Sequence, residues 1–511
     1  MREFLDRMNI LNWKLTGHII GMLVMLEAVF LSVSTIVALR YNVWGEDHDL
    51  TAMLVTTGVC VLIGGTLLLS NRRYNNSKFS YREGFFIVTM TWLLFSVIGM
   101  LPYLIYGTFI SVTDAFIETV SGFTTTGCTV MNDIDAQPHG ILLWRSMTQW
   151  IGGLGIIVFS LALLPRFTTG NTQMFSAEVT GMSIDKLRPR IQDTSMTLWT
   201  IYVTLTLVCA FLFWCGGMNL FDAFNHAMTT LSSGGFSTHQ SSLGFYHSAF
   251  IEYVCCIFLF ITSVNFTLFY FLRKKLWRPV WHNDELRWFF FIVVGFTLLF
   301  ILLFVCAGWH TGADYDPYGA APQGVEETFR TSLFHVLTII STCGFQGEHY
   351  DYDLWGRMFW LPTLLMMVCG GCAGSTAGGI KVVRVVILLK NLMQELLQHL
   401  SPRKLLAIRL NNAIIPQEHS HRVMAFMFTY VVLAVICVFV MQAMGFDTDT
   451  AIGTTITSFG NCGPGLSLTG PAFTWSDLPD AAKWMMSFAM LMGRLEFFTV
   501  ILLLTPSFWK K

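Results

Sequence analysis

The amino-acid sequence predicts an all-α integral membrane protein with ten transmembrane helices, arranged as two N-terminal spans and four repeats of helix, re-entrant loop and helix. The first observation is composition: 54% of the 511 residues are hydrophobic and only 12% are charged, whereas soluble domains carry about 25% charged residues. The second is the recurrence of apolar runs of about 20 residues, the length that crosses a bilayer as a helix. The third is a set of polar, glycine-bearing segments at equivalent places between those runs.

The apolar runs also predict an orientation. Most of the 31 Lys and Arg residues fall in segments that are cytoplasmic if the N-terminus is inside, so the positive-inside rule places both termini in the cytoplasm. The opposite loops are acidic, for example at Asp133, Asp135 and Glu348, and would concentrate cations there. The spans cover approximately residues 18–39, 51–70, 84–107, 141–164, 197–217, 249–272, 288–308, 358–398 with an interruption, 424–444 and 482–505.

The four polar segments are in register with one another. Each runs from an Asp or Thr to a glycine thirteen residues later, and each lies between the two spans of one repeat. The register divides the chain into a two-span domain (1–78) and repeats one (79–190), two (191–282), three (283–411) and four (412–511). The segments are DAFIETVSGFTTTGCTV from Asp114, DAFNHAMTTLSSGGFST from Asp222, TSLFHVLTIISTCGFQG from Thr331 and TAIGTTITSFGNCGPGL from Thr450, with Gly127, Gly235, Gly344 and Gly463 aligned.

These segments are predicted to be short re-entrant helices followed by extended strands. Backbone groups cannot stay unpaired in hydrocarbon, so a non-helical segment at membrane depth is buried in protein or lines a water-filled path. The Asp or Thr at each start is expected to cap a helix of about three turns. The helix C-terminus carries partial negative charge and favours a cation, and the strand glycine permits dihedrals closed to other residues. Cys128, Phe236 and Phe345 are expected to point away from the axis and to hold the strands in place.

The four glycine-bearing motifs resemble those of a known protein family. TTTGCT, SSGGFS, STCGF and GNCGPG resemble the four pore-loop filters of the Trk/Ktr/HKT superfamily of potassium transporters, and the two extra N-terminal spans match its TrkH subfamily. The resemblance implies a potassium-channel-like pore, although Pro464 departs from the Phe of repeats two and three. Carried over by position, the carbonyls of the potassium filter belong to Thr125, Thr126 and Gly127; Ser233, Gly234 and Gly235; Thr342, Cys343 and Gly344; Asn461, Cys462 and Gly463.

The resemblance also implies a function and partners. It implies potassium uptake across the bacterial inner membrane by a homodimer, with no enzymatic activity and no covalent cofactor. Potassium would be the substrate and would bind only at the filter residues, where Gly127 replaces the serine of sodium-preferring relatives. A cytoplasmic nucleotide-binding ring of the TrkA type is the implied regulator, and no nucleic acid is involved. The membrane potential alone could drive accumulation, and the sequence leaves coupling to protons or sodium open.

A gate is predicted below the filter. The eighth span contains CGGCAGSTAGGIK, and its five glycines are incompatible with a stiff continuous helix. Arg494 lies within the last span, where an unpartnered arginine costs about 2.5–3.5 kcal/mol or more, and carbonyls of residues 370–379 or Glu496 could receive it. We expect this loop to cross the pore while Arg494 anchors it and repels cations. The predicted gate comprises Gly370, Gly371, Cys372, Ala373, Gly374, Ser375, Thr376, Ala377, Gly378, Gly379 and Arg494.

The sequence leaves several other functions and residue roles open. The pore could prefer sodium or pass mixed cations, the chain could be a receptor or scaffold, and Cys369 and Cys372 could serve a membrane redox protein. Small residues packing in a helix explain the CGGC more simply, and Arg494 with Glu496 could be a purely structural pair. His226 and His335 are expected to be hydrogen-bonded residues behind the filter and not metal ligands. The basic segment 381–411 could set topology, contact anionic lipid or dock the regulator.

Overall fold

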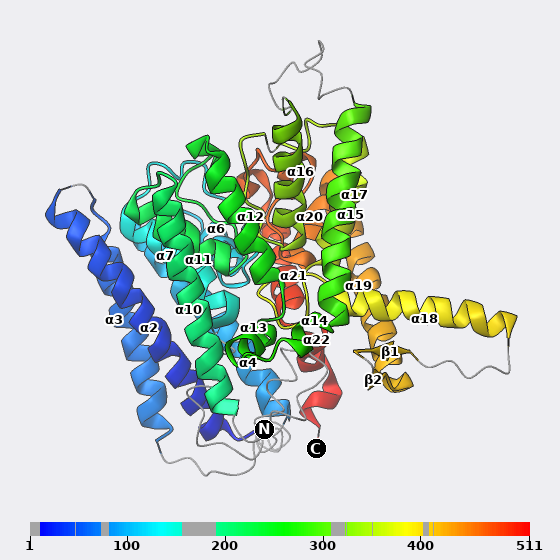
Figure 1. The fold of residues 1–511 in the computed structure, drawn as a ribbon. Coiled ribbons are helices and arrows are strands. Elements are labelled where there is room, and N and C mark those ends of the chain that lie inside the picture. Colours follow the sequence, from blue (N-terminus) through cyan, green and yellow to red (C-terminus); the bar gives the residue numbers. More distant parts are fainter. Residues whose placement is uncertain are drawn as a thin grey trace.

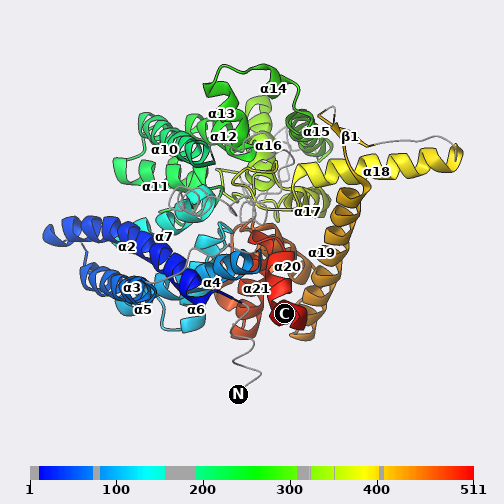
Figure 2. The same ribbon diagram turned by 90° about the horizontal axis from the view of Figure 1, so that it is seen from below.

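The computed structural model describes residues 11–45, 47–72, 81–155, 191–307, 322, 324–349, 351–401, 408–411 and 413–510. Within these residues, six helices are long and apolar enough to cross a membrane, and two further pairs of helices pass the same test as bent units. The helices surround a central axis, as the view along it shows (Figures 1 and 2). The second half of the predicted fourth span, residues 156–164, lies outside the described residues.

The N-terminal helices pack against repeat one. The first two, α2 and α3, lie side by side at the edge of the molecule (Figures 1 and 2). The side chain of Asn12 caps α2 by accepting a bond from the backbone of Leu15 (3.2 Å). Two further helices lead into the first polar segment, and Pro102 stands at the start of the second of them, where a missing N–H costs nothing. The elements are α2 (Trp13–Val43), α3 (Leu50–Ser70), α4 (Tyr81–Gly99) and α5 (Leu101–Tyr106).

Each repeat contains a long helix, a short helix and a second helix, and within the described residues the second helix breaks in repeats two, three and four. In Figure 2 the four short helices and their following strands surround the centre of the molecule. Repeat one uses α4 and α5, α6 (Val112–Phe123), α7 (His139–Trp150) and the π-helix η1 (Ile151–Gly155); repeat two uses α10 (Ile191–Cys215), α11 (Leu220–Leu231), α12 (Ala249–Ser263) and α13 (Phe266–Arg273). Repeat three uses α15 (Asp284–Cys306), α16 (Gly324–Ile340) and α17 (Trp360–Cys369); repeat four uses α19 (Gln417–Ala443), α20 (Thr448–Gly460), α21 (Asp480–Arg494) and α22 (Phe498–Leu504).

Short elements complete the described chain. The 3-10 turns lie mostly in the loops that follow the polar segments, and a two-stranded antiparallel ribbon precedes α19. The elements are η3 (Ser242–Tyr246), α14 (Arg278–Trp281), η5 (Arg357–Phe359), α18 (Val382–Leu400), β1 (Arg409–Leu410), β2 (Ala413–Ile414), η6 (Ser467–Thr469), η7 (Trp475–Asp477) and η8 (Pro506–Trp509).

The short helices start earlier than predicted. In three repeats the N-cap lies three residues before the expected residue, and its side-chain oxygen accepts a backbone bond from the first turn. In repeat three α16 begins at Gly324, so Thr331 lies inside the helix and its predicted capping role is wrong. The observed caps are Ser111, Asn219 and Asp447, in place of the predicted Asp114, Asp222 and Thr450, which occupy the third helical position.

The second helices of repeats two and four break at mid-length, so the predicted spans 249–272 and 482–505 are each a bent pair of helices. The sixth span bends by 92° between α12 and α13, and the tenth bends by 118° between α21 and α22. No glycine marks the bend in repeat two; instead the Asn265 side chain caps α13 by accepting a bond from Thr267 N (2.9 Å). Asparagine at this position ends one helix and starts the next because its side chain replaces the missing intrahelical partner.

The predicted eighth span is also wrong in its second half. The helix α17 ends at Cys369, and α18 leaves the bundle sideways without continuing its direction (Figures 1 and 2). Only the first turns of α18 are buried, at Val382, Val386 and Ile387. The glycine-rich segment between the two helices turns the chain, so α18 lies across the bundle.

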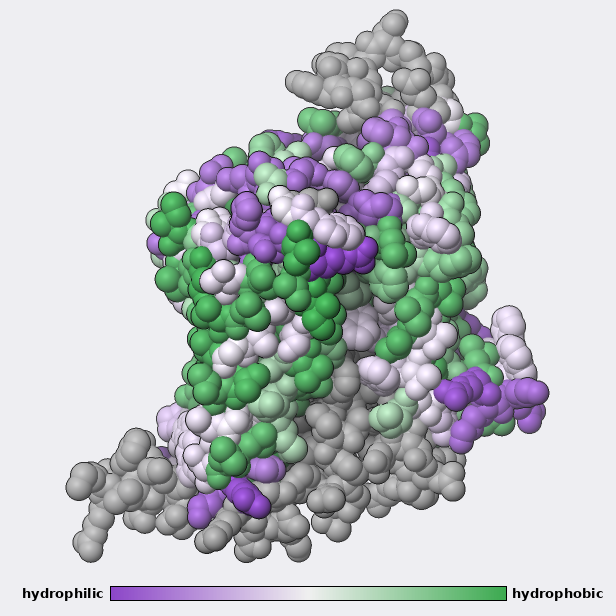
Figure 3. Space-filling view, turned by 90° about the vertical axis from the view of Figure 1, so that its left-hand side faces the viewer, coloured by the Kyte–Doolittle hydropathy of each residue, from purple (hydrophilic) through white to green (hydrophobic). Residues whose placement is uncertain are grey.

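The surface and the chain ends fit a membrane protein. On the face in Figure 3, hydrophobic residues occupy the middle, and hydrophilic residues gather above and below. Large apolar side chains such as Phe291 and Leu298 are exposed, as expected of residues that face lipid. Phe86 makes edge contacts with Trp13 at the start of α2 and with Trp509 near the C-terminus. The described ends of the chain therefore meet on one side, as the charge distribution predicts.

Candidate ion filter and gate

The short helices end in a shared left-handed turn. At the end of α6, Thr125 N donates to Gly122 O (3.0 Å) and Thr126 N donates to Ser121 O (2.9 Å), the pairing of a Schellman motif. Repeats two and three repeat this pattern. A left-handed β-branched residue such as Thr125 is uncommon, and such strain costs about 1–3 kcal/mol and clusters at functional sites. The left-handed residues are Thr125 (φ 54°), Ser233 (φ 55°), Thr342 (φ 59°) and Asn461 (φ 53°).

Two residues later, the four aligned glycines form a closed ring. All have positive φ, between 78° and 90°, which favours glycine over every other residue. A methyl group on Gly127 would lie 2.1 Å from the carbonyl oxygen of Gly234, so repeat one faces repeat two. The same relation joins Gly235 to Cys343 O (1.9 Å), Gly344 to Cys462 O (2.3 Å) and Gly463 to Thr126 O (2.9 Å). Each glycine thus faces the carbonyl that precedes the glycine of the next repeat, and the circle closes.

The side chains that follow the glycines are buried in the surrounding helices. Cys128, Phe236 and Phe345 are at most 4% exposed, as expected for residues that hold the strands from behind. Hydroxyl groups of the short helices also hold the strands, since Ser121 Oγ donates to Cys128 O (2.6 Å) and Thr338 Oγ1 donates to Phe345 O (3.1 Å). The ring is therefore supported from outside by packing and by hydrogen bonds.

Charged side chains connect neighbouring repeats around the ring through hydrogen bonds and ion pairs. Arg145 of α7 binds Glu118 of α6 (Nε to Oε1, 2.7 Å), donates to the Ser237 carbonyl of repeat two (2.8 Å) and covers the ring of Phe236 (3.6 Å). Similar links join repeat two to repeat three and repeat four to repeat one. These are Glu252 with Arg330 (2.5 Å) and Asp114 with Lys483 (2.6 Å).

Removing one member of a buried pair is expected to destabilise the protein. Glu118→Ala leaves Arg145 buried and without its carboxylate, at a cost of about 3–5 kcal/mol, because both side chains are at most 2% exposed. Thermal unfolding in detergent should show a clearly lower midpoint for this variant. Glu418→Ala, which removes the exposed i,i+4 partner of Arg422, is the control and should leave the midpoint unchanged. Equal midpoints for both variants would contradict this account of the ion pairs.

A polar cavity of about 330 Å³ opens onto the ring. All four ring glycines line it, together with loop residues such as His239 and Trp475. His239 contacts Asp135 (2.7 Å) and Asp222 (3.1 Å) and stacks on Phe245. Burial opposes the charged form of His239, but the two carboxylates outweigh it and raise its pKa. No motif in the sequence selects His239, because its partner Asp135 comes from repeat one and meets it only in the folded chain.

The glycine-rich segment between α17 and α18 crosses the other side of the ring. Its backbone and hydroxyl groups bind the left-handed residues and the helix ends of three repeats, on the side opposite the cavity. These bonds are Thr376 Oγ1 with Ser233 Oγ (2.9 Å), Gly378 N to Thr342 Oγ1 (2.6 Å) and Gly379 N to Gly460 O (2.9 Å). The segment therefore lies directly below the strands.

Two further contacts fix the same segment at its edges. Cys372 N donates to Ser263 O (2.8 Å), where the second helix of repeat two breaks. Ala373 N donates to the buried carboxylate of Glu285 at the start of α15 (2.7 Å). The loop is thus held by repeats two and three, in addition to the strands above it.

Arg494 joins this loop to repeats one and four. Its guanidinium donates to Thr376 O (3.0 Å) in the loop and to Gly153 O (2.8 Å) in η1 of repeat one. Loop carbonyls are thus partners of Arg494, as expected. The carboxylate of Glu496, the other expected partner, binds Arg384 of α18 (2.6 Å).

The predicted histidines are hydrogen-bonded and fully buried. His226 contacts Asp222 O and Ser237 Oγ (both 2.9 Å), and His335 contacts Thr363 Oγ1 (2.9 Å). Among the described residues, no group of three or more His, Cys, Asp or Glu side chains could hold a metal ion. Cys369 and Cys372 are free thiols, and Cys372 is buried.

Comparisons with known proteins show the family of this chain. The family model described as "TrkH: Cation transport protein" matches residues 51–511. The chain is 36% identical to the Trk system potassium uptake protein TrkH of Escherichia coli strain K12 over 506 residues, covering 98% of this chain and 100% of that protein. It is 37% identical to the protein of the same name from Vibrio parahaemolyticus over 501 residues, covering 96% and 98%.

A solved structure shows the same fold. The crystal structure of the potassium transporter TrkH from Vibrio parahaemolyticus matches with a TM-score of 0.84 at 35% identity, covering 98% of this chain and 100% of that chain. The predicted helical membrane fold and the family resemblance are therefore confirmed. The chain belongs to the TrkH family of cation transport proteins.

Proposed function

We propose that this protein takes up potassium through a gated pore within each protomer. The observation that carries the proposal is the closed ring in which each aligned glycine faces the carbonyl before the glycine of the next repeat. A ring of backbone carbonyls can replace the water shell of a potassium ion. The printed names of the relatives, Trk system potassium uptake proteins, support the same substrate.

The filter in this proposal consists of the twelve residues selected from the sequence, three in each repeat. In each repeat the first filter residue and the glycine have positive φ, and the residue between them does not. This alternation lets successive carbonyls face the axis. The short helices direct their negative C-terminal ends toward the same axis. Gly127 and its three equivalents leave room for the ion where a side chain would enter the ring.

The gate in this proposal is the loop of residues 370–379 together with Arg494. Its support is the position of the loop across the inner side of the strands and the bond from Arg494 to Thr376 O. A cationic guanidinium beside the pathway repels a passing cation. Moving the loop away from Ser233 and Thr342 would open the path.

The remaining assignments extend the proposal. The protein acts in the bacterial inner membrane with both termini in the cytoplasm, requires no cofactor, and is built from the two-span domain and four repeats bounded as above. A second copy of the chain and a TrkA-type nucleotide-binding ring are its proposed partners. The exposed apolar side chains of α18, including Leu389, Leu392 and Leu396, support a second copy, because isolated apolar patches of this kind favour association.

The test is a flux measurement on the purified protein in liposomes. A potassium gradient should drive accumulation of rubidium, and the protein should also restore growth of a bacterial strain that lacks potassium uptake. Absence of both would favour a receptor or scaffold, and equal sodium flux would favour a mixed-cation permease. Replacing Cys369 and Cys372 together by serine should leave the flux intact, whereas loss of an activity that depends on these thiols would favour the redox alternative.

A further inference from the structure

Gln149 of α7 binds the filter strand of repeat two on both sides of its glycine. The side chain is fully buried, its Nε2 donates to Gly234 O (2.7 Å), and its Oε1 accepts from Phe236 N (3.0 Å). The two bonds enclose Gly235. A single amide therefore fixes the direction of one carbonyl and the position of the next peptide group.

The carbonyl that Gln149 binds is a member of the ring. Gly234 O is the oxygen that faces Gly127, 2.1 Å from a methyl group placed there. A carbonyl oxygen has two lone pairs, so Gly234 O can accept the amide and keep a second lone pair for an ion. One of the four ring oxygens is thus restrained by a side chain from the neighbouring repeat.

Repeat four offers an internal comparison, because Gly152 and Gly493 occupy equivalent positions. A methyl group on Gly152 would lie 1.9 Å from Phe123 O, and one on Gly493 would lie 2.3 Å from Phe459 O. Phe123 and Phe459 each lie four residues before their ring glycine. The two second helices therefore pass their own short helices in the same way.

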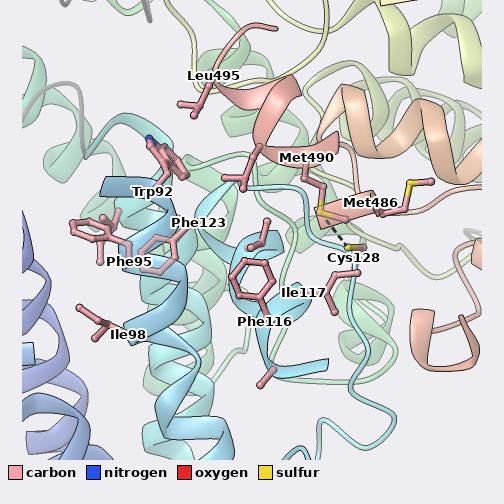
Figure 4. Close-up of a cluster of buried hydrophobic side chains, with 14 of the residues drawn as sticks. Trp92, Phe95, Ile98, Phe116, Ile117, Phe123, Cys128, Met486, Met490 and Leu495 are labelled. Carbon is pink, nitrogen blue, oxygen red and sulfur yellow. Dashed lines mark hydrogen bonds between the residues drawn. The ribbon is translucent and has the colours of Figure 1, made fainter. Parts of the chain in front are cut away.

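Three residues before these glycines stand Gln149 and Met490. Met490 contacts Cys128, the residue after the ring glycine of repeat one, through sulfur atoms 3.9 Å apart (Figure 4). Gln149 contacts Phe236, the equivalent residue in repeat two. The two side chains thus hold the next strand from the same place, one by an apolar contact and one by a polar clamp.

We propose that Gln149 is a specificity-determining positioning residue of the filter, an inference that rests on the proposed potassium pore. A sodium ion is smaller than potassium and is coordinated well only if the ring contracts. The clamp resists contraction because moving Gly234 O inward breaks its bond to Nε2 and shifts the bond to Phe236 N. Gln149 therefore disfavours sodium without contacting the ion.

The test compares sodium and potassium flux in Gln149→Met, which installs the residue of repeat four. The expected result is retained potassium or rubidium flux with a loss of roughly tenfold in discrimination against sodium, since both hydrogen bonds of the Gln149 amide are removed. Gln442→Met makes the same substitution at an exposed amide of α19, which contacts Thr448 and not the ring. This variant is the matched control and should keep the wild-type ratio. An unchanged ratio in Gln149→Met would overturn the inference. Absence of potassium flux in the wild-type protein would instead overturn the proposed function.

A second variant covers the case in which Gln149→Met fails to fold or to conduct. Gln149→Glu keeps the acceptor for Phe236 N but donates to Gly234 O only when the carboxyl is protonated. Its selectivity is therefore expected to approach that of the wild type at acidic pH and to fall as the pH rises. A side chain that only fills space would not produce this pH profile. The inference would therefore also be overturned if the ratio of potassium to sodium flux in Gln149→Glu, divided by that of the wild type, did not change with pH.

Discussion

Replacing Gly235 by alanine is expected to slow ion flux strongly while leaving the protein folded in the membrane. The new methyl group would lie 1.9 Å from Cys343 O, inside the ring, and the backbone there has φ of 80°. Relieving that overlap moves the carbonyls away from the ion. An increase of about 3 kcal/mol in the barrier slows transport by about a hundredfold. Rubidium uptake into liposomes measures the effect directly.

Gly295→Ala is the matched control for this variant. Gly295 lies in α15 with nothing near its would-be methyl group, so flux should equal that of the wild type. Size-exclusion chromatography should give the same elution volume for both variants. Wild-type flux in Gly235→Ala would show that the glycine ring does not surround the ion path.

Replacing Arg494 by alanine is expected to raise the flux measured without any cytoplasmic partner. The substitution removes the charged donor to Thr376 O and to Gly153 O, and a hydrogen bond to a charged group contributes about 1.5–3 kcal/mol. Weakening the closed state by this amount raises the ratio of open to closed loop conformations by roughly tenfold or more. It also removes a positive charge from the pathway. The rate of rubidium entry into liposomes is the measurement.

A shortened loop provides an independent test of the gate. Deleting residues 374–377 removes the contact of Thr376 with Ser233 and should likewise raise the flux. Arg422→Ala, at an exposed position near the start of α19, is the control and should leave it unchanged. If Arg494→Ala and the deletion both kept the wild-type flux, the loop would not be the gate.

Much of the fold could be predicted because it follows from composition and register. Apolar runs of bilayer length identify the long helices, and the thirteen-residue spacing from Asp or Thr to glycine aligns the four short helices. The ring could be anticipated because the same backbone geometry requires glycine at Gly127 and its three equivalents. These features depend on local sequence, so an internal repeat reveals them without an alignment.

The breaks and the supports of the ring could not be predicted in the same way. The bend at Asn265 depends on a side chain that caps α13, and one asparagine in an apolar span gives no distinctive signal. Arg145 and Gln149 gain their roles only when α7 packs against the strand of repeat two. The caps were misplaced because an Asp or Thr at the third helical position gives the same sequence pattern as one at the N-cap.

The central claim is that cations pass through the axis ringed by Gly127, Gly235, Gly344 and Gly463. Crystals of the protein grown in rubidium or thallium, with anomalous diffraction measured at the absorption edge of the ion, test it most directly. Anomalous density is expected on this axis, within coordination distance of the carbonyls of Thr126, Gly234, Cys343 and Cys462. A conducting protein whose ordered ions all lie away from that ring would contradict it.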